Sequence, residues 1–78
     1  MKYIVETREN GVPISKKMIT ADNPKTATLT SINQILKTKP IDIVEVLVDN
    51  KDGKSWRFVV EINHKNRQLK IIKESKRN

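Results

Sequence analysis

Two segments in the second half of the chain alternate apolar with other residues, which is the pattern of strands that bury one face. The alternating positions are Val44, Val46 and Val48 in the first segment and Trp56, Phe58, Val60 and Ile62 in the second. A three-residue loop at 51–53, with Gly53 in a left-handed conformation, sets Val48 opposite Trp56 and keeps the later apolar residues matched. A four-residue loop would set Val48 against Ser55 and shift every match. The pattern therefore predicts the shorter loop.

A third strand is predicted from about Leu69 to Glu74, which leaves residues 75–78 loose. A two-residue turn at 65–66, with Asn66 tolerating a positive φ, connects it to the second strand. The cross-strand pairs that follow are Ile62 with Leu69, Val60 with Ile71, Glu61 with Lys70 and Arg57 with Glu74. These apolar matches and opposite charges fix the expected register.

Near the N-terminus, Asn10-Gly11 separates two β-rich segments, residues 2–8 and 14–20, and suits a tight hairpin turn. Two registers fit this hairpin. A two-residue turn pairs Val5 with Lys16. A four-residue loop is favoured, because it keeps Pro13 out of the ladder and matches residues across the strands. Its pairs are Ile4 with Ile19 and Glu6 with Lys17.

Between the hairpin and the other strands, the sequence predicts one helix. Asn23 suits the N-cap, and Pro24 suits the first helical position, where it loses no hydrogen bond. The helix should end near Thr38, because Pro40 prevents its continuation. One apolar stripe is expected at Leu29, Ile32, Ile35 and Leu36.

These elements predict a single small α+β domain of ββαβββ order, in which one helix packs on one face of an antiparallel sheet. The domain should span residues 1–74, with a flexible basic end at 75–78. Nothing in the first six residues resembles a signal peptide, and no stretch approaches the roughly 20 apolar residues of a membrane span. We therefore expect a cytoplasmic protein with no membrane partner. The chain has no cysteine, so disulfides cannot stabilise it.

The net charge of +7 is concentrated near the C-terminus. Residues 64–78 contain one acid, Glu74, and six cations that are candidate phosphate ligands. The candidates are Lys65, Arg67, Lys70, Lys73, Lys76 and Arg77. Lysine supplies 12 of the 16 cations, as expected from a genome rich in adenine and thymine, and it binds phosphate less specifically than arginine does. Pairing of Lys70 with Glu61 would leave cations free mainly at the last turn and at the terminus.

Motifs for catalysis, metals or cofactors are missing from the sequence. Gly53-Lys54-Ser55 imitates the end of a phosphate-binding loop, but Val48 occupies the position of the required earlier glycine. Residues 49–53 lack the alternating acids of a calcium loop. His64 has no ligand or catalytic partner at a suitable spacing and is interpreted as a surface histidine. No enzymatic activity and no cofactor are expected.

Both faces of the predicted sheet bear on function. Trp56 and Phe58 share the apolar face, so we interpret them as core residues and not as a base-stacking platform. The opposite face carries an unusual number of apolar residues among its charges. These candidate protein-interaction residues are Ile43, Leu47, Val59 and Ile72. The N-terminal hairpin, a second copy of the chain or another protein could cover them.

Two functions follow as hypotheses. The first is a non-enzymatic nucleic-acid-binding module that contacts the phosphate backbone through the basic C-terminal hairpin. The alternative is a protein-interaction or inhibitor module that acts through the apolar sheet face or a sheet edge, including as a homodimer. Small chains without an enzyme signature are common among phage and mobile-element proteins that bind a host component.

Overall fold

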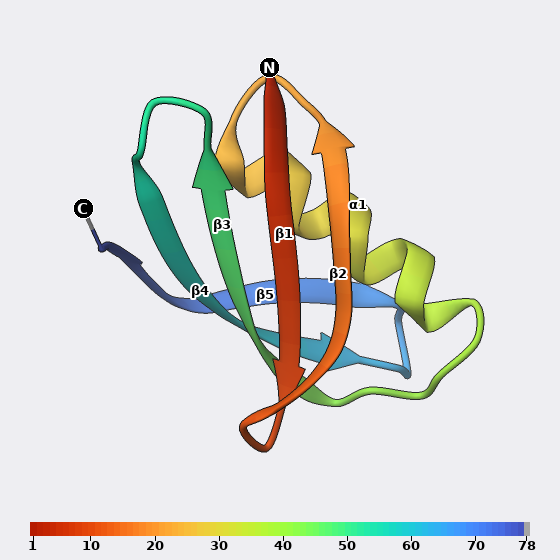
Figure 1. Ribbon diagram of the computed structural model, residues 1–78. Coiled ribbons are helices and arrows are strands. Elements are labelled where there is room, and N and C mark those ends of the chain that lie inside the picture. Colours follow the sequence, from red (N-terminus) through yellow and green to blue (C-terminus); the bar gives the residue numbers. More distant parts are fainter. Residues whose placement is uncertain (78) are drawn as a thin grey trace.

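A computed structural model describes residues 1–77, which form one five-stranded antiparallel sheet and one helix (Figure 1). In chain order the elements are β1 (Lys2–Glu9), β2 (Val12–Thr20), α1 (Pro24–Leu36), β3 (Ile43–Asn50), β4 (Ser55–Asn63) and β5 (Gln68–Lys76). The spatial order of the strands is β2-β1-β3-β4-β5. The predicted ββαβββ order and the single helix on an antiparallel sheet are confirmed.

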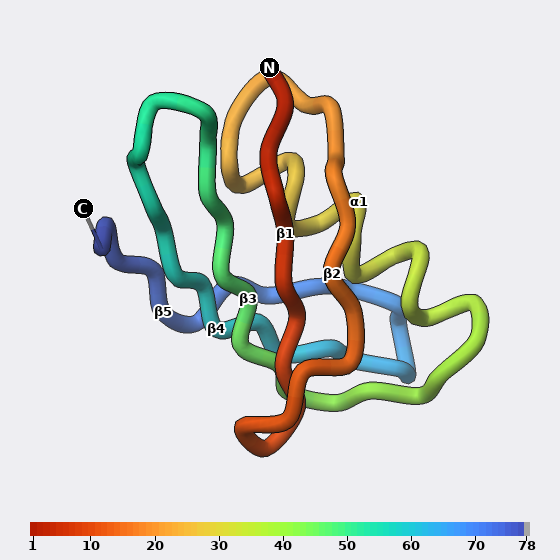
Figure 2. The backbone as a smooth tube through the Cα atoms, in the orientation of Figure 1, coloured from red at the N-terminus to blue at the C-terminus, as the bar shows by residue number. Residues whose placement is uncertain are grey.

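The sheet is strongly twisted, and α1 covers only part of it. The helix packs against β1, β2 and β3. In Figure 1, β5 crosses the direction of β1, and the end of α1 and the turn between β4 and β5, both traced in Figure 2, line a common hollow. This follows from the right-handed twist that accumulates from strand to strand. The side of α1 that is turned towards β4 and β5 therefore does not pack closely against these two strands.

The core lies between α1 and the face of the sheet beneath it. Val5, Val46 and Ile32 are fully buried there, and each strand except β5 contributes at least one buried apolar side chain. The predicted helical stripe is rotated: Ile32 and Ile35 are buried, but Leu29 and Leu36 are only partly buried, although Leu36 still packs against the core. Small side chains at Ala27, Thr28 and Ser31 occupy the buried positions instead. Small residues let the helix approach the sheet closely.

The hairpin of β3 and β4 has the predicted register. Val48 lies opposite Trp56, Val46 opposite Phe58 and Val44 opposite Val60. Gly53 has a φ of +81°, as the three-residue loop requires. A hydrogen bond from the Asn50 N–H to the Lys54 carbonyl, at 3.0 Å, closes the turn.

The favoured register of the first hairpin is wrong. Asn10 and Gly11 form a two-residue turn in which both residues have positive φ, and Pro13 lies inside β2. A bulge then adds Ile14 to β2 opposite the Thr7/Arg8 step. The observed pairs include Ile4 with Met18, Val5 with Lys17 and Glu6 with Lys16. Because β2 is an edge strand, it tolerates both the proline and the bulge.

The hairpin of β4 and β5 agrees with the prediction only near its turn. Ile62 lies opposite Leu69, Glu61 opposite Lys70 and Val60 opposite Ile71, as predicted. A bulge at Ile72 then shifts the ladder, so Arg57 lies opposite Ser75, and the predicted pairing of Arg57 with Glu74 is wrong. The residue with positive φ in the turn is Arg67, not Asn66.

The end of β5 lies two residues beyond the predicted end at Glu74. The strand continues to Lys76, and the Arg77 N–H donates to the Ser55 carbonyl at 2.8 Å. Of the segment 75–78 that was expected to be loose, residues 75 and 76 thus belong to the sheet. Asn78 lies outside the described residues.

The face of the sheet away from α1, here called the outer face, is not covered by the N-terminal hairpin. β1 and β2 extend the sheet sideways from β3 and do not fold across it (Figure 1). Ile43 and Ile72 keep 52% and 48% of their surface exposed on this side. Of the three covers considered for this face, the hairpin is therefore excluded.

Candidate functional site

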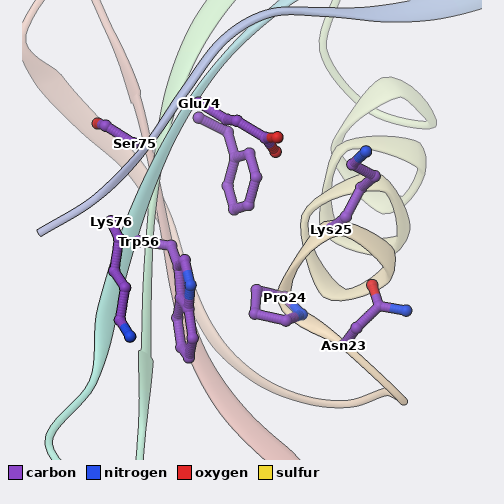
Figure 3. A pocket seen from close by; sticks show the side chains of 8 residues that line it. Asn23, Pro24, Lys25, Trp56, Glu74, Ser75 and Lys76 are labelled. Atoms are coloured by element: carbon purple, nitrogen blue, oxygen red, sulfur yellow. The ribbon is translucent and has the colours of Figure 1, made fainter. Parts of the chain in front are cut away.

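The first hollow beside the helix lies between the start of α1 and the last residues of β5, and we call it the helix-start hollow (Figure 3). It is lined by residues 23–25, Trp56 and Phe58 of β4, and residues 74–76 of β5, and it has a volume of about 510 Å³. Asn23 caps the helix by accepting a hydrogen bond from the Thr26 N–H at 2.8 Å. The cap and the β4–β5 ladder therefore hold the two sides of the hollow in place.

Trp56 forms one side of the helix-start hollow. Tyr3, which is 2% exposed, meets its indole edge to face at a centroid distance of 6.1 Å. Lys76 lies opposite Trp56 in the ladder, and in Figure 3 the two side chains run alongside each other with Pro24 on the far side of the indole. Phe58 is only 3% exposed, whereas Trp56 is only partly buried. The core interpretation therefore holds for Phe58 but describes only part of the Trp56 ring.

The second hollow, here called the helix-end hollow, lies between the end of α1 and the β4–β5 turn. Its lining consists of Asn33, residues 36–40, Ile62, His64 and Arg67, and its volume is about 680 Å³. Leu36 and Ile62 supply its apolar surface. The cations Lys37, Lys39 and Arg67 are exposed around it. No acidic residue is part of this lining.

His64 connects the β4–β5 turn to the segment that precedes β3. Its Nε2 lies 2.7 Å from the Ile41 carbonyl oxygen and 3.1 Å from Asp42 Oδ1. A carbonyl oxygen can only accept, so Nε2 carries the hydrogen. The Ile62 N–H also donates to the Asp42 carbonyl, at 2.7 Å. These bonds tie the end of β4 and the start of the β4–β5 turn to the segment between α1 and β3.

Few of the cations around the two hollows have ion-pair partners. Lys39 lies 3.8 Å from Glu9, an exposed pair of the kind that contributes only tenths of a kcal/mol. Within residues 1–77 no ion pair involves Lys25, Lys37, Arg67 or Lys76. Their charges are therefore available to an anion. Among the described residues 1–77, Glu74 is the one acidic side chain that lines either hollow.

The six predicted cations do not form one surface. All are exposed, but Lys65 and Arg67 lie in the β4–β5 turn, and Arg67 lines the helix-end hollow. Lys76 lines the helix-start hollow. Lys70 and Lys73 lie opposite Glu61 and Val59 and therefore on the outer face. Arg77 follows the end of β5. The structure thus brings only part of the predicted set to the hollows.

Three further lysines lie at the hollows and were not predicted as ligands. They are Lys25 at the start of α1 and Lys37 and Lys39 just after its end. In the sequence, lysines after a helix are explained by the helix dipole, and an isolated lysine in the first turn carries no signal. Lys25, Leu29 and Leu36 are spaced four and seven residues apart, which places them on one side of the helix. This spacing is the sequence signal that could have indicated which side of the helix faces β4 and β5.

The candidate protein-interaction residues lie on the outer face. Ile43 and Ile72 are exposed, while Leu47 and Val59 are partly buried. Ile4 and Met18 lie opposite each other at another part of this face, and both are exposed. Ion pairs lie between these apolar residues. They join Arg8 to Glu6, at 2.5 Å, and Arg57 to Glu45. The outer face is therefore mixed and not uniformly basic.

The described part of the chain, residues 1–77, contains no cluster of three or more potential metal ligands and no helix long and apolar enough to cross a membrane. Comparison with protein-family models, curated proteins and solved structures found no match to this chain.

Proposed function

We propose that this chain is a non-enzymatic nucleic-acid-binding module and that the rims of the two hollows contact the phosphate backbone. The observation that carries this proposal is the convergence of cations from separate segments on one side of α1. Lys25 comes from the helix, Lys37 and Lys39 from the segment after it, and Arg67 and Lys76 from the β4–β5 hairpin. A single acid, Glu74, lines this surface with them.

Distance between the cations favours a polymer over a small anion. Trp56 at one hollow and His64 at the other are eight positions apart along the chain, which is about 25 Å of extended chain. A small anion can occupy one hollow at a time, whereas a polyanion can contact both rims. Phosphate contacts of this kind provide affinity and salt dependence without sequence specificity.

The first test is the double variant Lys37→Gln/Arg67→Gln, titrated with fluorescently labelled DNA and RNA from low to physiological salt. Each phosphate contact that is lost should lower the slope of log K against log salt by about 0.7 for single strands and about 0.9 for duplex DNA. We therefore expect the slope to decrease by the amount that corresponds to one or two lost phosphate contacts. Binding at low salt should also become weaker. Fluorescence anisotropy measures both.

The matched control is Lys16→Gln/Lys51→Gln. These exposed lysines lie on β2 and in the β3–β4 turn, away from both hollows, and their replacement removes the same amount of charge. The control should bind almost as tightly as the natural chain. If no nucleic acid binds even at low salt, or if the two double variants lose affinity equally, the proposed surface is wrong.

A second candidate function is self-association through the outer face. Ile43 and Ile72 are exposed there to an extent unusual for isoleucine in a small domain. The face also carries both signs of charge, at Glu6 and Arg8 and again at Glu45 and Arg57. A surface with both signs can complement itself across a two-fold axis. The mass of the protein in solution tests this candidate.

A further inference from the structure

We infer that the nucleic acid bound by this surface is single-stranded and that Trp56 stacks on one of its bases inside the helix-start hollow. This inference rests on the nucleic-acid-binding function proposed above. The proposed function concerns contacts to phosphates alone. The inference specifies in addition that the ligand is single-stranded and that one residue contacts a base.

The indole ring of Trp56 lies where a base could reach it. Trp56 is partly exposed in a hollow of about 510 Å³, and the buried Tyr3 contacts its ring edge to face. This contact restricts the ring before a ligand arrives, so less side-chain entropy is lost on binding. A stacking interaction needs an aromatic ring that is held in place and open on one side.

Positive charges lie around the Trp56 ring. Lys76 runs beside the indole, and Lys25 lies on the helix side of the same hollow (Figure 3). Alternation of an aromatic surface with cations matches the alternation of bases with phosphates along a single strand. Glu74 also lines the hollow, so a small free anion finds opposing charges close together there. A base with flanking phosphates places its negative groups at the rim.

The recessed position of the Trp56 ring disfavours a duplex as the ligand. The indole lies between Lys76 and Pro24 and not on a protruding loop (Figure 3). In a duplex both faces of each base are stacked on neighbouring bases, so no face is free to enter a recess. A single strand can turn a base out of its stack at much lower cost. The recess therefore discriminates between the two forms of nucleic acid.

Trp56 is the only tryptophan in the chain, so its fluorescence reports directly on the proposed contact. The protein is titrated at low salt with a single-stranded oligothymidylate, with a DNA duplex and with inorganic polyphosphate. Anisotropy of labelled oligonucleotides measures binding, and competition measures polyphosphate binding. We expect strong quenching of tryptophan fluorescence by the single strand, little quenching by the duplex, and none by polyphosphate.

Two lysines on β5 provide a matched pair of variants. Lys76 lines the hollow opposite Trp56, whereas Lys73 lies opposite Val59 on the outer face. Lys76→Gln should weaken single-strand binding several-fold and leave the quenching at saturation unchanged. Lys73→Gln should change affinity less than twofold. The two variants carry the same charge, so the comparison isolates the position of the lysine.

A third variant removes the ring itself. Trp56→Leu should weaken single-strand binding about 5- to 150-fold, the range that corresponds to loss of one base–aromatic stack. Its duplex and polyphosphate binding should stay nearly unchanged. Because Trp56 also contacts Tyr3, circular dichroism must show that the variant is folded. If it is not, the Lys76 and Lys73 pair and the fluorescence titration decide the question alone.

The outcomes separate the two proposals. If single strands bind by anisotropy but neither quench Trp56 nor respond to Lys76→Gln, the stacking inference is overturned and the basic surface survives. Equal quenching by duplex and single strand overturns the strand preference. If neither DNA nor RNA binds at low salt, the proposed function itself falls, and the inference falls with it.

Discussion

Asn23 determines where α1 begins and, with it, one side of the helix-start hollow. Its side-chain oxygen accepts from the Thr26 N–H at 2.8 Å, and its carbonyl accepts from the Ala27 N–H at 3.1 Å. Pro24 then occupies the first helical position, where its missing N–H is not needed. The cap therefore satisfies a donor that the first turn cannot satisfy internally.

Replacing this cap should destabilise the protein measurably. We expect Asn23→Ala to lower the free energy of unfolding by about 1 kcal/mol, which corresponds to about 4–8 °C in melting temperature for a domain of this size. Asn33→Ala is the control, because it makes the same chemical change at an exposed position inside the helix. Alanine is the better helix former there, so stability should stay equal or rise slightly. Equal losses in thermal denaturation would contradict the capping role.

Trp56 shows what the sequence can and cannot predict about the site. Alternation with Phe58 and Val60 places Trp56 correctly on the apolar face. Alternation does not reveal how far the helix extends over that face. α1 packs on β1 to β3, so Trp56, at the start of β4, keeps part of its surface open to the hollow. The exposure depends on the twist of the whole sheet, which no local pattern contains.

The helix illustrates a similar limit at the scale of one element. The structure confirms the start at Pro24, predicted from Asn23 and Pro24, whereas the helix ends at Leu36, two residues before the end predicted near Thr38. Its buried face was predicted less well, because the largest apolar residues were assumed to point inwards. Leu29 instead lies on the flank towards β4 and β5, while Ser31 is fully buried. Contact with a nearby sheet favours small side chains at the centre of the interface.

This rotation of the helix predicts unequal effects of two similar truncations. Ile32 is fully buried, whereas Leu29 is only partly buried, and both would lose the same number of heavy atoms on replacement by alanine. We expect Ile32→Ala to cost about 2–5 kcal/mol in unfolding free energy and Leu29→Ala less than half as much. Urea denaturation measures the difference. If Ile32→Ala does not fold, Ile32→Val should still cost about 0.5–1.5 kcal/mol. A larger loss for Leu29→Ala would contradict the observed orientation of α1.

The strand registers were predictable only where the ladder is regular. Between β3 and β4 the alternating valines and Gly53 determine the pairing completely. On the two edge strands, β2 and β5, bulges at Ile14 and Ile72 each add one residue and move later residues to new partners. An edge strand has one neighbour, so a bulge disrupts a single ladder and is tolerated. Both bulged residues are apolar and resemble ordinary strand residues, so the sequence pattern does not indicate the position of either bulge.

At the scale of the whole molecule, charge that is contiguous in sequence becomes divided in space. The six cations of the C-terminal segment are distributed over the β4–β5 turn, the outer face and the helix-start hollow. Lysines from α1 and the segment after it join them beside the helix. The net charge of +7 indicated a polyanion as a partner, but only the fold shows which cations lie together.

The outer face carries the exposed apolar residues Ile43 and Ile72, and its behaviour is a property of the whole sheet. If a second copy of the chain covers it, light scattering at rising concentration should show a mass that approaches twice the monomer mass of 9.0 kDa. Ile72→Lys should shift the protein to the monomer, because it places a charge among the exposed apolar residues. Val12→Lys is the control, since Val12 is 60% exposed but lies at the turn of the first hairpin. Dimerisation driven by apolar contact should also persist at high salt, unlike nucleic-acid binding. A monomer at all concentrations, or equal effects of the two variants, would rule out self-association through this face.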